Sequence, residues 1–490
     1  MIDRRRFIQL GSGLAASSVL ACDRLPQLLL TREIMGDSAP FEPPDVSYVD
    51  LVSHAISRLS YGAAPGEYAR VRALGRTPHD AVAAYVREQL APDQLDDERA
   101  EAALRRLSIL ELPVGELFEY KAPVVLDTLT RGRLLRATLS RRQLHEAMVE
   151  FWSDHFNIDS SKGDCRWLKA ADERDVIRAH ALGSFAAMVR ASALSPAMLW
   201  YLDGRVNRRA NAAELPNENY ARELLELHTL GVHGGYTQRD VMEAARALTG
   251  WTVRGLGESS FGLGRVEFAR ELHDDAQKVV LGEVIPAGGG EKDIDRLVEI
   301  VCAHPATATH LSTKLCRRFI ADDPPRRAVE SVASMFSGSG GDIRATLAAL
   351  LATPEFLAVR GTKLKRPFHF VVSALRATDA ASDAGPALQD YLSRMGHAPF
   401  QYPTPDGYAD DATAWTATLL WRWNFAMALQ RNRIQGTRVD AAGLERRAGG
   451  RRALAAHLLG RRPTPDEWSA HESTPDTLAL LVASPAFQRF

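Results

Sequence analysis

The stretch 217–231 has polar side chains at spacings that suit acid–base chemistry on a helix. With 3.6 residues per turn, Asn219, Glu223 and Glu226 share one helix face, while His228 lies on an apolar face. Such a row could provide oxygen ligands or a general base in a cleft. The same spacing also fits a surface ladder of salt bridges opposite a core face with one satisfied histidine. The spacing alone leaves both interpretations open.

A second segment, residues 145–157, has the same layout. His155 falls on a stripe of apolar side chains, and Glu150 falls on a stripe with other polar groups. Two such helices facing each other could assemble a carboxylate and histidine site within a bundle. Neither segment has the Glu-x-x-His pair of di-iron bundles or the His-Glu-x-x-His pattern of zinc proteases. Metal binding is therefore the less favoured alternative, and the cofactor content is unknown from the sequence.

A third candidate is the group His273, Asp274 and Lys278, at an expected turn. It could supply a base, an orienting carboxylate and a positive charge that stabilises an anion. Asp274 could equally do no more than close the turn. Motifs for a nucleophilic serine and for a phosphate-binding loop are absent from the sequence.

The elements that must position these groups are mainly helices. Apolar residues recur at intervals of three and four along many segments. We expect helices at 80–90, 98–110, 123–139, 140–156, 172–193, 217–230, 237–248, 293–303, 305–320 and 343–352. Asn217 and Gly231 provide a start and a stop signal, and Thr237 with Asp240 resembles a capping box. The sequence therefore predicts a mainly α-helical fold, with one large multi-helix domain.

One region departs from helical spacing. Between residues 251 and 286, the short stretches 266–268 and 278–282 are rich in β-formers and lie near glycines. We interpret them as a small β-hairpin inserted between helices.

The N-terminus resembles an export signal. Arg4 and Arg5 precede Phe7 in the order that a twin-arginine translocase recognises. An uncharged stretch, 10–21, follows and is shorter than the roughly 20 apolar residues of a membrane span. It ends at Cys22 in a sequence that resembles a lipoprotein cleavage site, and the alternative is an ordinary cleaved signal. We expect a periplasmic or extracytoplasmic protein tethered to the cytoplasmic membrane by lipid on Cys22.

Four segments follow from this organisation. Residues 1–22 form the signal, 23–47 a proline-containing linker, 48–430 the main helical domain with its insertion, and 431–490 a further pair of C-terminal helices packed on it. The net charge is -1 and the two signs are mixed along the chain, which disfavours nucleic acid as a partner. In an oxidising compartment, Cys302 and Cys316 could form a disulfide.

Taken in order, these segments resemble a bacterial family known only as domain of unknown function 1800. The resemblance lies in His54–Gly62, Glu150–Asn157, Asn217–Gly235, Ala245–Trp251, His273–Asp274 with Lys278 and Gly282, His304–Pro305 and Ser484–Phe487. The sequence departs from the family at His397, where glutamine is usual. The resemblance implies exported, largely helical proteins, often encoded beside a family related to alkaline phosphatases and sulfatases. It assigns no activity.

We therefore expect an envelope enzyme or ligand-handling protein with one cleft between helices. The candidate residues are Glu150, His155, Asn219, Glu223, Glu226, His228, His273, Asp274 and Lys278. Glu223 would be the general base or an oxygen ligand, His273 and Asp274 an acid–base pair, and Lys278 a charge stabiliser. The alternatives are a non-catalytic lipoprotein scaffold for a co-exported phosphatase- or sulfatase-like partner and a cofactor-loaded oxidoreductase.

Overall fold

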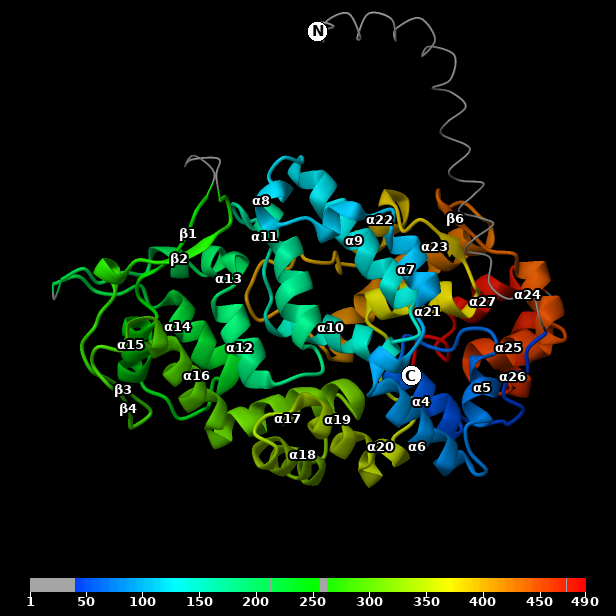
Figure 1. The fold of residues 1–490 in the computed structure, drawn as a ribbon. Helices are drawn as coiled ribbons and strands as arrows, with labels where there is room; N and C mark the ends of the chain where they lie inside the picture. The colour runs from blue at the N-terminus through cyan, green and yellow to red at the C-terminus, as the bar shows by residue number, and fades with distance from the viewer. Residues whose placement is uncertain (1–39, 212, 256–261, 473) are drawn as a thin grey trace, which may run out of the picture.

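The computed structural model describes residues 40–211, 213–255, 262–472 and 474–490 (Figure 1). The predicted export and lipidation residues, Arg4, Arg5, Phe7 and Cys22, lie outside these ranges. Within them, helices dominate and the strands form three two-stranded antiparallel sheets. The mainly α-helical class is confirmed. Among the described residues, none of the helices has the length and apolar character needed to cross a membrane.

The first part of the chain ends in a central helix, α10. The helices of this part are α4 (Leu51–Leu59), α5 (Glu67–Arg72), α6 (Pro78–Gln89), α7 (Glu98–Leu104), α8 (Val114–Leu117), α9 (Ala122–Leu139) and α10 (Gln143–His155). The middle part contains α11 (Cys165–Asp172), α12 (Phe185–Ala193), α13 (Pro196–Tyr201), α14 (Asn219–Glu223), α15 (Gln238–Ala247), α16 (Asp293–Ala303), α17 (Pro305–Phe319), α18 (Arg326–Gly338), α19 (Ile343–Leu351) and α20 (Pro354–Ala358).

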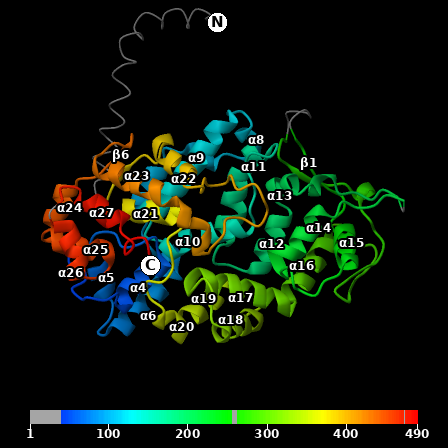
Figure 2. The same cartoon turned by 180° about the vertical axis from the view of Figure 1, so that it is seen from behind.

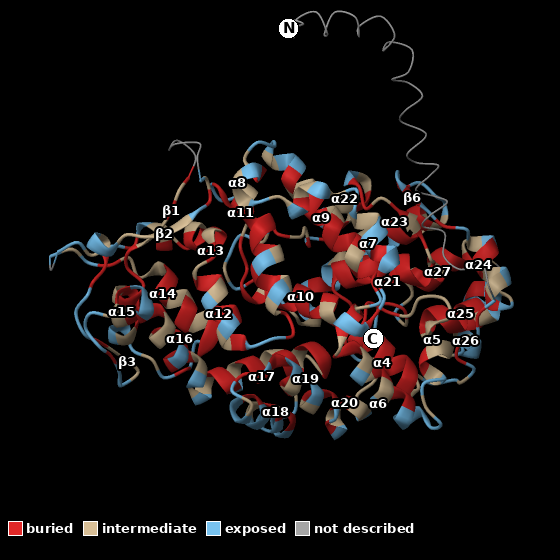
Figure 3. Cartoon of the chain, in the orientation of Figure 1, coloured by how far each residue is buried: buried red, intermediate tan, exposed pale blue. Residues whose placement is uncertain are grey.

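The last part folds back beside the first. Its helices are α21 (Pro367–Ala377), α22 (Pro386–Arg394), α23 (Leu419–Gln430), α24 (Ala441–Ala448), α25 (Arg451–Leu459), α26 (Pro465–Glu472) and α27 (Thr477–Ala483). Helices α4–α6 lie next to α24–α26 at one end of the body (Figures 1 and 2). One large core gathers α4, α6 and most of α10–α20, and a second gathers α9 and α21–α27. Helix α10 lies in the middle of the body and is buried along most of its length (Figure 3).

Two predicted helices are interrupted by π-helical turns. The segment Glu173–Arg178 follows α11, and the segment Leu224–Thr229 follows α14. A π-helical turn adds one residue to the helical repeat, so it shifts the face on which the following side chains point. The face expected for Glu226 and His228 from 3.6-residue spacing is therefore changed. The capping box of Thr237 and Asp240 at the start of α15 is confirmed.

The predicted hairpin is two hairpins. Strand β1 (Trp251–Val253) pairs with β2 (Val266–Phe268), and β3 (Lys278–Val280) pairs with β4 (Glu283–Ile285). The prediction treated β2 and β3 as one unit and missed that β2 pairs with the preceding strand and β3 with the following one. A further pair joins β5 (Ala381–Ser382) to β6 (Thr437–Arg438).

The C-terminal segment has four helices, α24–α27, where we predicted a pair. Glycines in the left-handed region end the first two: Gly449 has φ 89° and Gly460 has φ 66°. Such glycines end helices within short stretches that apolar spacing alone would merge. The described cysteines Cys165, Cys302 and Cys316 are free, so the disulfide between the last two is not formed.

Helix α10 places three carboxylates, one turn apart, inside the protein. Glu146 accepts two hydrogen bonds from Arg178, of 2.8 and 2.6 Å. Glu150 and Asp154 are both held by Arg366, which donates to each carboxylate over 2.6 Å. Because a buried carboxylate without a partner is strongly destabilising, Arg366 fixes the start of α21 against α10.

We expect Arg366→Met to destabilise the protein by about 3–5 kcal/mol, because it leaves Glu150 charged and without its main partner. Urea denaturation at neutral pH measures this change. The matched control is Arg326→Met, which removes an exposed surface ion pair with Glu330 and should leave the midpoint nearly unchanged. Equal midpoints for the two variants would contradict the role of Arg366.

Candidate active site

A cavity of about 200 Å³ lies at the C-terminal end of α10. Its walls come from α10, α17, the start of α21 and the loop 400–410. We call it the His155 cavity; it is lined by Phe151, Asp154, His155, Lys314, Arg317, Arg318, Arg366, Tyr402, Asp406, Gly407, Tyr408, Ala409 and Asp410. Distant parts of the sequence therefore meet at one polar hollow.

The loop 400–410 is seated firmly on the end of α10. The amide of Asn157 donates to the carbonyl oxygens of Tyr402 and Thr404 over 3.0 and 2.7 Å. Gly407 has φ 73°, and a Cβ at this position would lie 2.1 Å from the carbonyl oxygen of Asp154. Only glycine permits this approach, so the loop can close one side of the cavity.

His155 is held in one tautomer by its two neighbours. Its Nε2 lies 3.0 Å from the carbonyl oxygen of His228, which can only accept a hydrogen bond. Its Nδ1 therefore lacks a proton and accepts from Nζ of Lys314 over 2.9 Å. Burial and the positive charge of Lys314 hold the pKa of His155 well below its ordinary value. His155 is thus a neutral acceptor for the lysine.

Lys314 and Asp154 have pKa values shifted toward each other. Burial lowers the pKa of Lys314 to about 8, and the charge of Asp154 opposes that shift. Burial and the charge of Glu150 raise the pKa of Asp154, against the effect of Arg366. Only Oδ2 of Asp154 is held by the guanidinium, and among the described residues Oδ1 has no hydrogen-bond partner. Shifts of this kind mark Asp154 and Lys314 as candidate proton-transfer groups.

The cavity is also lined by the guanidinium groups of Arg317 and Arg318. Arg318 is 3% exposed, and its Nε has no hydrogen-bond partner within the described residues. Its nearest ion pair, to Glu150, is long at 3.8 Å. Arg317 lines the same wall, one residue before it. Guanidinium groups beside a partly buried lysine favour a negatively charged group in the cavity.

The structure brings part of the predicted set to this site. The ring centroids of His155 and His228 lie 6.1 Å apart. Glu150 accepts a hydrogen bond from Arg366, which lines the cavity. His228 is fully buried, burial lowers its pKa to about 3, and neither ring nitrogen has a partner among the described residues. It packs against Phe156, with ring centroids 5.0 Å apart.

The carboxylates of the other helix face are partly exposed. Burial raises the pKa of Glu223, and the charges of Glu226 and Asp406 add to the shift. Asp406 lines the His155 cavity, so Glu223 lies close to that side of it. Glu226 accepts from Tyr236 over 3.3 Å, and Asn219 donates to a carboxylate outside the cavity.

His273, Asp274 and Lys278 form a separate, closed network. His273 and Lys278 both bind Asp293, and the side chains of His273 and Lys278 are fully buried. Asp274 makes no bond to His273 and instead pairs with Arg246 over 2.6 Å. The predicted acid–base pair is not formed, because the orienting carboxylate comes from α16. None of these residues lines the His155 cavity.

Sequence reasoning missed several lining residues. Lys314, Arg317 and Arg318 lie together on α17, and three cations within two turns of a largely buried helix were the available signal. The loop segment 402–410, with its tyrosines, aspartates and Gly407, was a second signal. His397 is buried beneath this loop, with its ring 4.3 Å from that of Tyr408.

Within the described residues, no group of three or more histidine, cysteine, aspartate or glutamate side chains is arranged to hold a metal ion.

Comparison with known families identifies the class. The family described as "Protein of unknown function (DUF1800)" matches residues 54–489. The chain belongs to this family, as the sequence resemblance predicted. None of the curated proteins and none of the solved structures matches it.

We expect Asp274→Asn to act on stability and not on the His155 cavity. Burial alone would raise the pKa of Asp274, but Arg246 and its other partners lower it to about 2. A lowered folded-state pKa contributes stability above the ordinary value and loses it as the pH falls toward 2. Urea denaturation should therefore show a deficit in the variant at pH 7 that shrinks toward pH 2.

The matched control is Asp275→Asn. Asp275 is exposed, and its ion pair with Arg270 is long, at 3.6 Å, so its loss should change the stability little. A deficit for Asp274→Asn that stays constant from pH 7 to pH 2 would show that its carboxylate is not the stabilising group.

Proposed function

We propose that the protein is an exported, lipid-tethered envelope enzyme that performs general acid–base catalysis on a negatively charged substrate in the His155 cavity. The observation that carries this proposal is the hydrogen bond of 2.9 Å between Lys314 and His155 in a buried, polar cavity. A lysine with a pKa of about 8 can donate a proton at neutral pH and recover it afterwards.

Each group then has a defined task. Oδ1 of Asp154 accepts a proton from the substrate or from an attacking water molecule. The ammonium of Lys314 donates a proton to the leaving atom, while His155 fixes its direction. Arg317 and Arg318 bind the negative charge of the substrate and any charge that develops in the transition state.

A scaffold for a co-exported partner is the second candidate. Its support is an apolar face of α23, where Leu419, Leu420 and Trp423 are 57%, 66% and 43% exposed. Clustered exposed apolar side chains favour protein docking. The partner suggested by family resemblance is a phosphatase- or sulfatase-like protein.

The test of catalysis compares Lys314→Met and Asp154→Asn with the wild type. Purified protein is incubated with soluble saccharides and phosphate esters extracted from the bacterial envelope, and products are detected by mass spectrometry. We expect each variant to lose about 100-fold or more of the rate, as for removal of a general acid or base. The wild-type rate should fall as the pH rises through about 8, because Lys314 loses its proton there.

Lys292→Met removes an exposed lysine and is the matched control. Full turnover by Lys314→Met would exclude the lysine as the proton donor. Absence of any product with the wild type, together with stoichiometric capture of a phosphatase- or sulfatase-like protein that is lost on Trp423→Ser, would favour the scaffold.

The export signal and the lipid anchor are tested separately. Cys22→Ala should release the protein from the membrane into the soluble envelope fraction, because the acyl chains that anchor it are lost. Replacing both Arg4 and Arg5 by lysine should retain it inside the cell. Cell fractionation with immunoblotting measures both, and Cys302→Ala is the control. Membrane retention of Cys22→Ala would exclude lipidation at this cysteine.

A further inference from the structure

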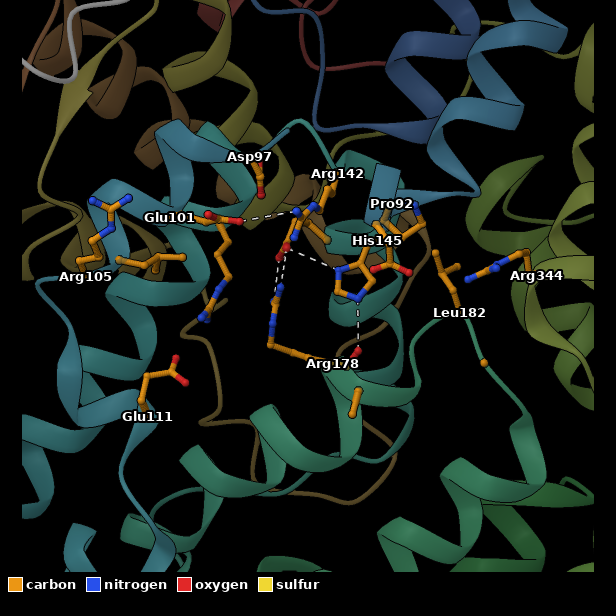
Figure 4. Close-up of a pocket in the computed structure, with 16 residues that line it drawn as sticks. Pro92, Asp97, Glu101, Arg105, Glu111, Arg142, His145, Arg178, Leu182 and Arg344 are labelled. Atoms are coloured by element: carbon orange, nitrogen blue, oxygen red, sulfur yellow. Dashed lines mark hydrogen bonds and ion pairs between the residues drawn. The ribbon is translucent and has the colours of Figure 1, made fainter. Parts of the chain in front are cut away.

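A second, larger pocket lies toward the other end of α10. It has a volume of about 780 Å³ and is bounded by α7, α9, α10 and the π-helical segment Glu173–Arg178 (Figure 4). Arg142, His145 and Arg178 are grouped at its centre, with Glu101, Arg105 and Glu111 toward one side of the view. This volume falls in the range of small-molecule sites, about 300–1,000 Å³.

The buried charges at the centre of this pocket are paired with each other. Burial alone would raise the pKa of Glu146, but the bidentate guanidinium of Arg178 holds it well below its ordinary value. His145 donates from Nε2 to the carbonyl oxygen of Arg178 over 3.2 Å. Glu146, Arg178 and His145 are thus engaged with one another and are not the groups expected to bind a ligand's charge.

Arg136 is a partly buried cation of the pocket. Among the described residues, its side chain makes no hydrogen bond and no ion pair. Burial and the positive charge of Arg178 lower its pKa to about 10. Partly buried guanidinium groups are normally paired, because five donors without acceptors are costly. A bound oxyanion would supply the missing acceptors in the bidentate geometry that arginine favours.

The rim offers both donors and acceptors. Arg105 and Arg344 are exposed cations on it, and Asp93 and Glu111 are exposed carboxylates. None of the four has an ion-pair partner among the described residues. Hydroxyl groups can accept hydrogen bonds from the first pair and donate hydrogen bonds to the second pair.

We propose that this pocket binds a hydroxyl-rich ligand that carries one oxyanion, such as an acidic sugar, with the oxyanion on Arg136. The site is distinct from the His155 cavity and shares no lining residue with it.

Isothermal titration calorimetry on the full-length protein, purified in detergent, tests the proposal. The probes are glucose 6-phosphate, glucuronate, glucose and inorganic phosphate. We expect a sugar anion to bind at least 10-fold more tightly than glucose or inorganic phosphate, and Arg136→Gln to weaken it at least 10-fold. The tighter of the two sugar anions tells whether the oxyanion is a phosphate or a carboxylate.

Arg131→Gln is the matched control, since Arg131 lies on the same helix and pairs with Asp127 away from the pocket. It should bind as the wild type does. If Arg136→Gln does not fold, the exposed Arg105 replaces it, and Arg105→Gln should weaken binding at least 3-fold. The proposal fails if neither sugar anion binds, if inorganic phosphate or glucose binds as tightly, or if no arginine variant of the pocket weakens binding.

Discussion

The structure depends on the pairing of carboxylates that α10 carries into the interior. Glu146, Glu150 and Asp154 follow one another at four-residue intervals. Arg178 pairs with Glu146, and Arg366 pairs with both Glu150 and Asp154. Ionised groups of this kind cannot be buried alone. The π-helical segment that carries Arg178 and the start of α21 that carries Arg366 must therefore dock on α10. Chain segments far apart in sequence are brought together by charge as well as by apolar packing.

The same pairing sets the chemistry of the His155 cavity. Arg366 is shared between Glu150 and Asp154, so it neutralises Asp154 only in part. Burial then raises the pKa of Asp154, while burial lowers the pKa of Lys314 in the same cavity. A carboxyl and an ammonium group whose pKa values approach each other are suited to proton transfer at neutral pH. In the network of Lys278 and Asp293, by contrast, both side chains are buried and bonded to each other, so neither is exposed to a substrate.

The sequence predicted the fold class, most long helices and the importance of the segment 145–157. Those features follow from local spacing and capping. It could not predict Arg366 or Lys314 as partners, because nothing in the local sequence of α10 specifies which distant cation will pair with it. Asp293 was missed for the same reason. The π-helical turn after α14 changed the side-chain faces, since a 3.6-residue template contains no extra residue.

Tyr61 explains why the two ends of α10 can serve separate sites. Its hydroxyl lies 3.3 Å from the carbonyl oxygen of Glu146 and 2.9 Å from the carboxylate of Glu150, so the middle of the helix is fixed. The carboxylates that α10 carries, Glu146, Glu150 and Asp154, are each paired with a guanidinium group. A two-state element would be required for coupling, and α10 is a single helix that is buried along most of its length. The geometry thus favours independent sites on a common support.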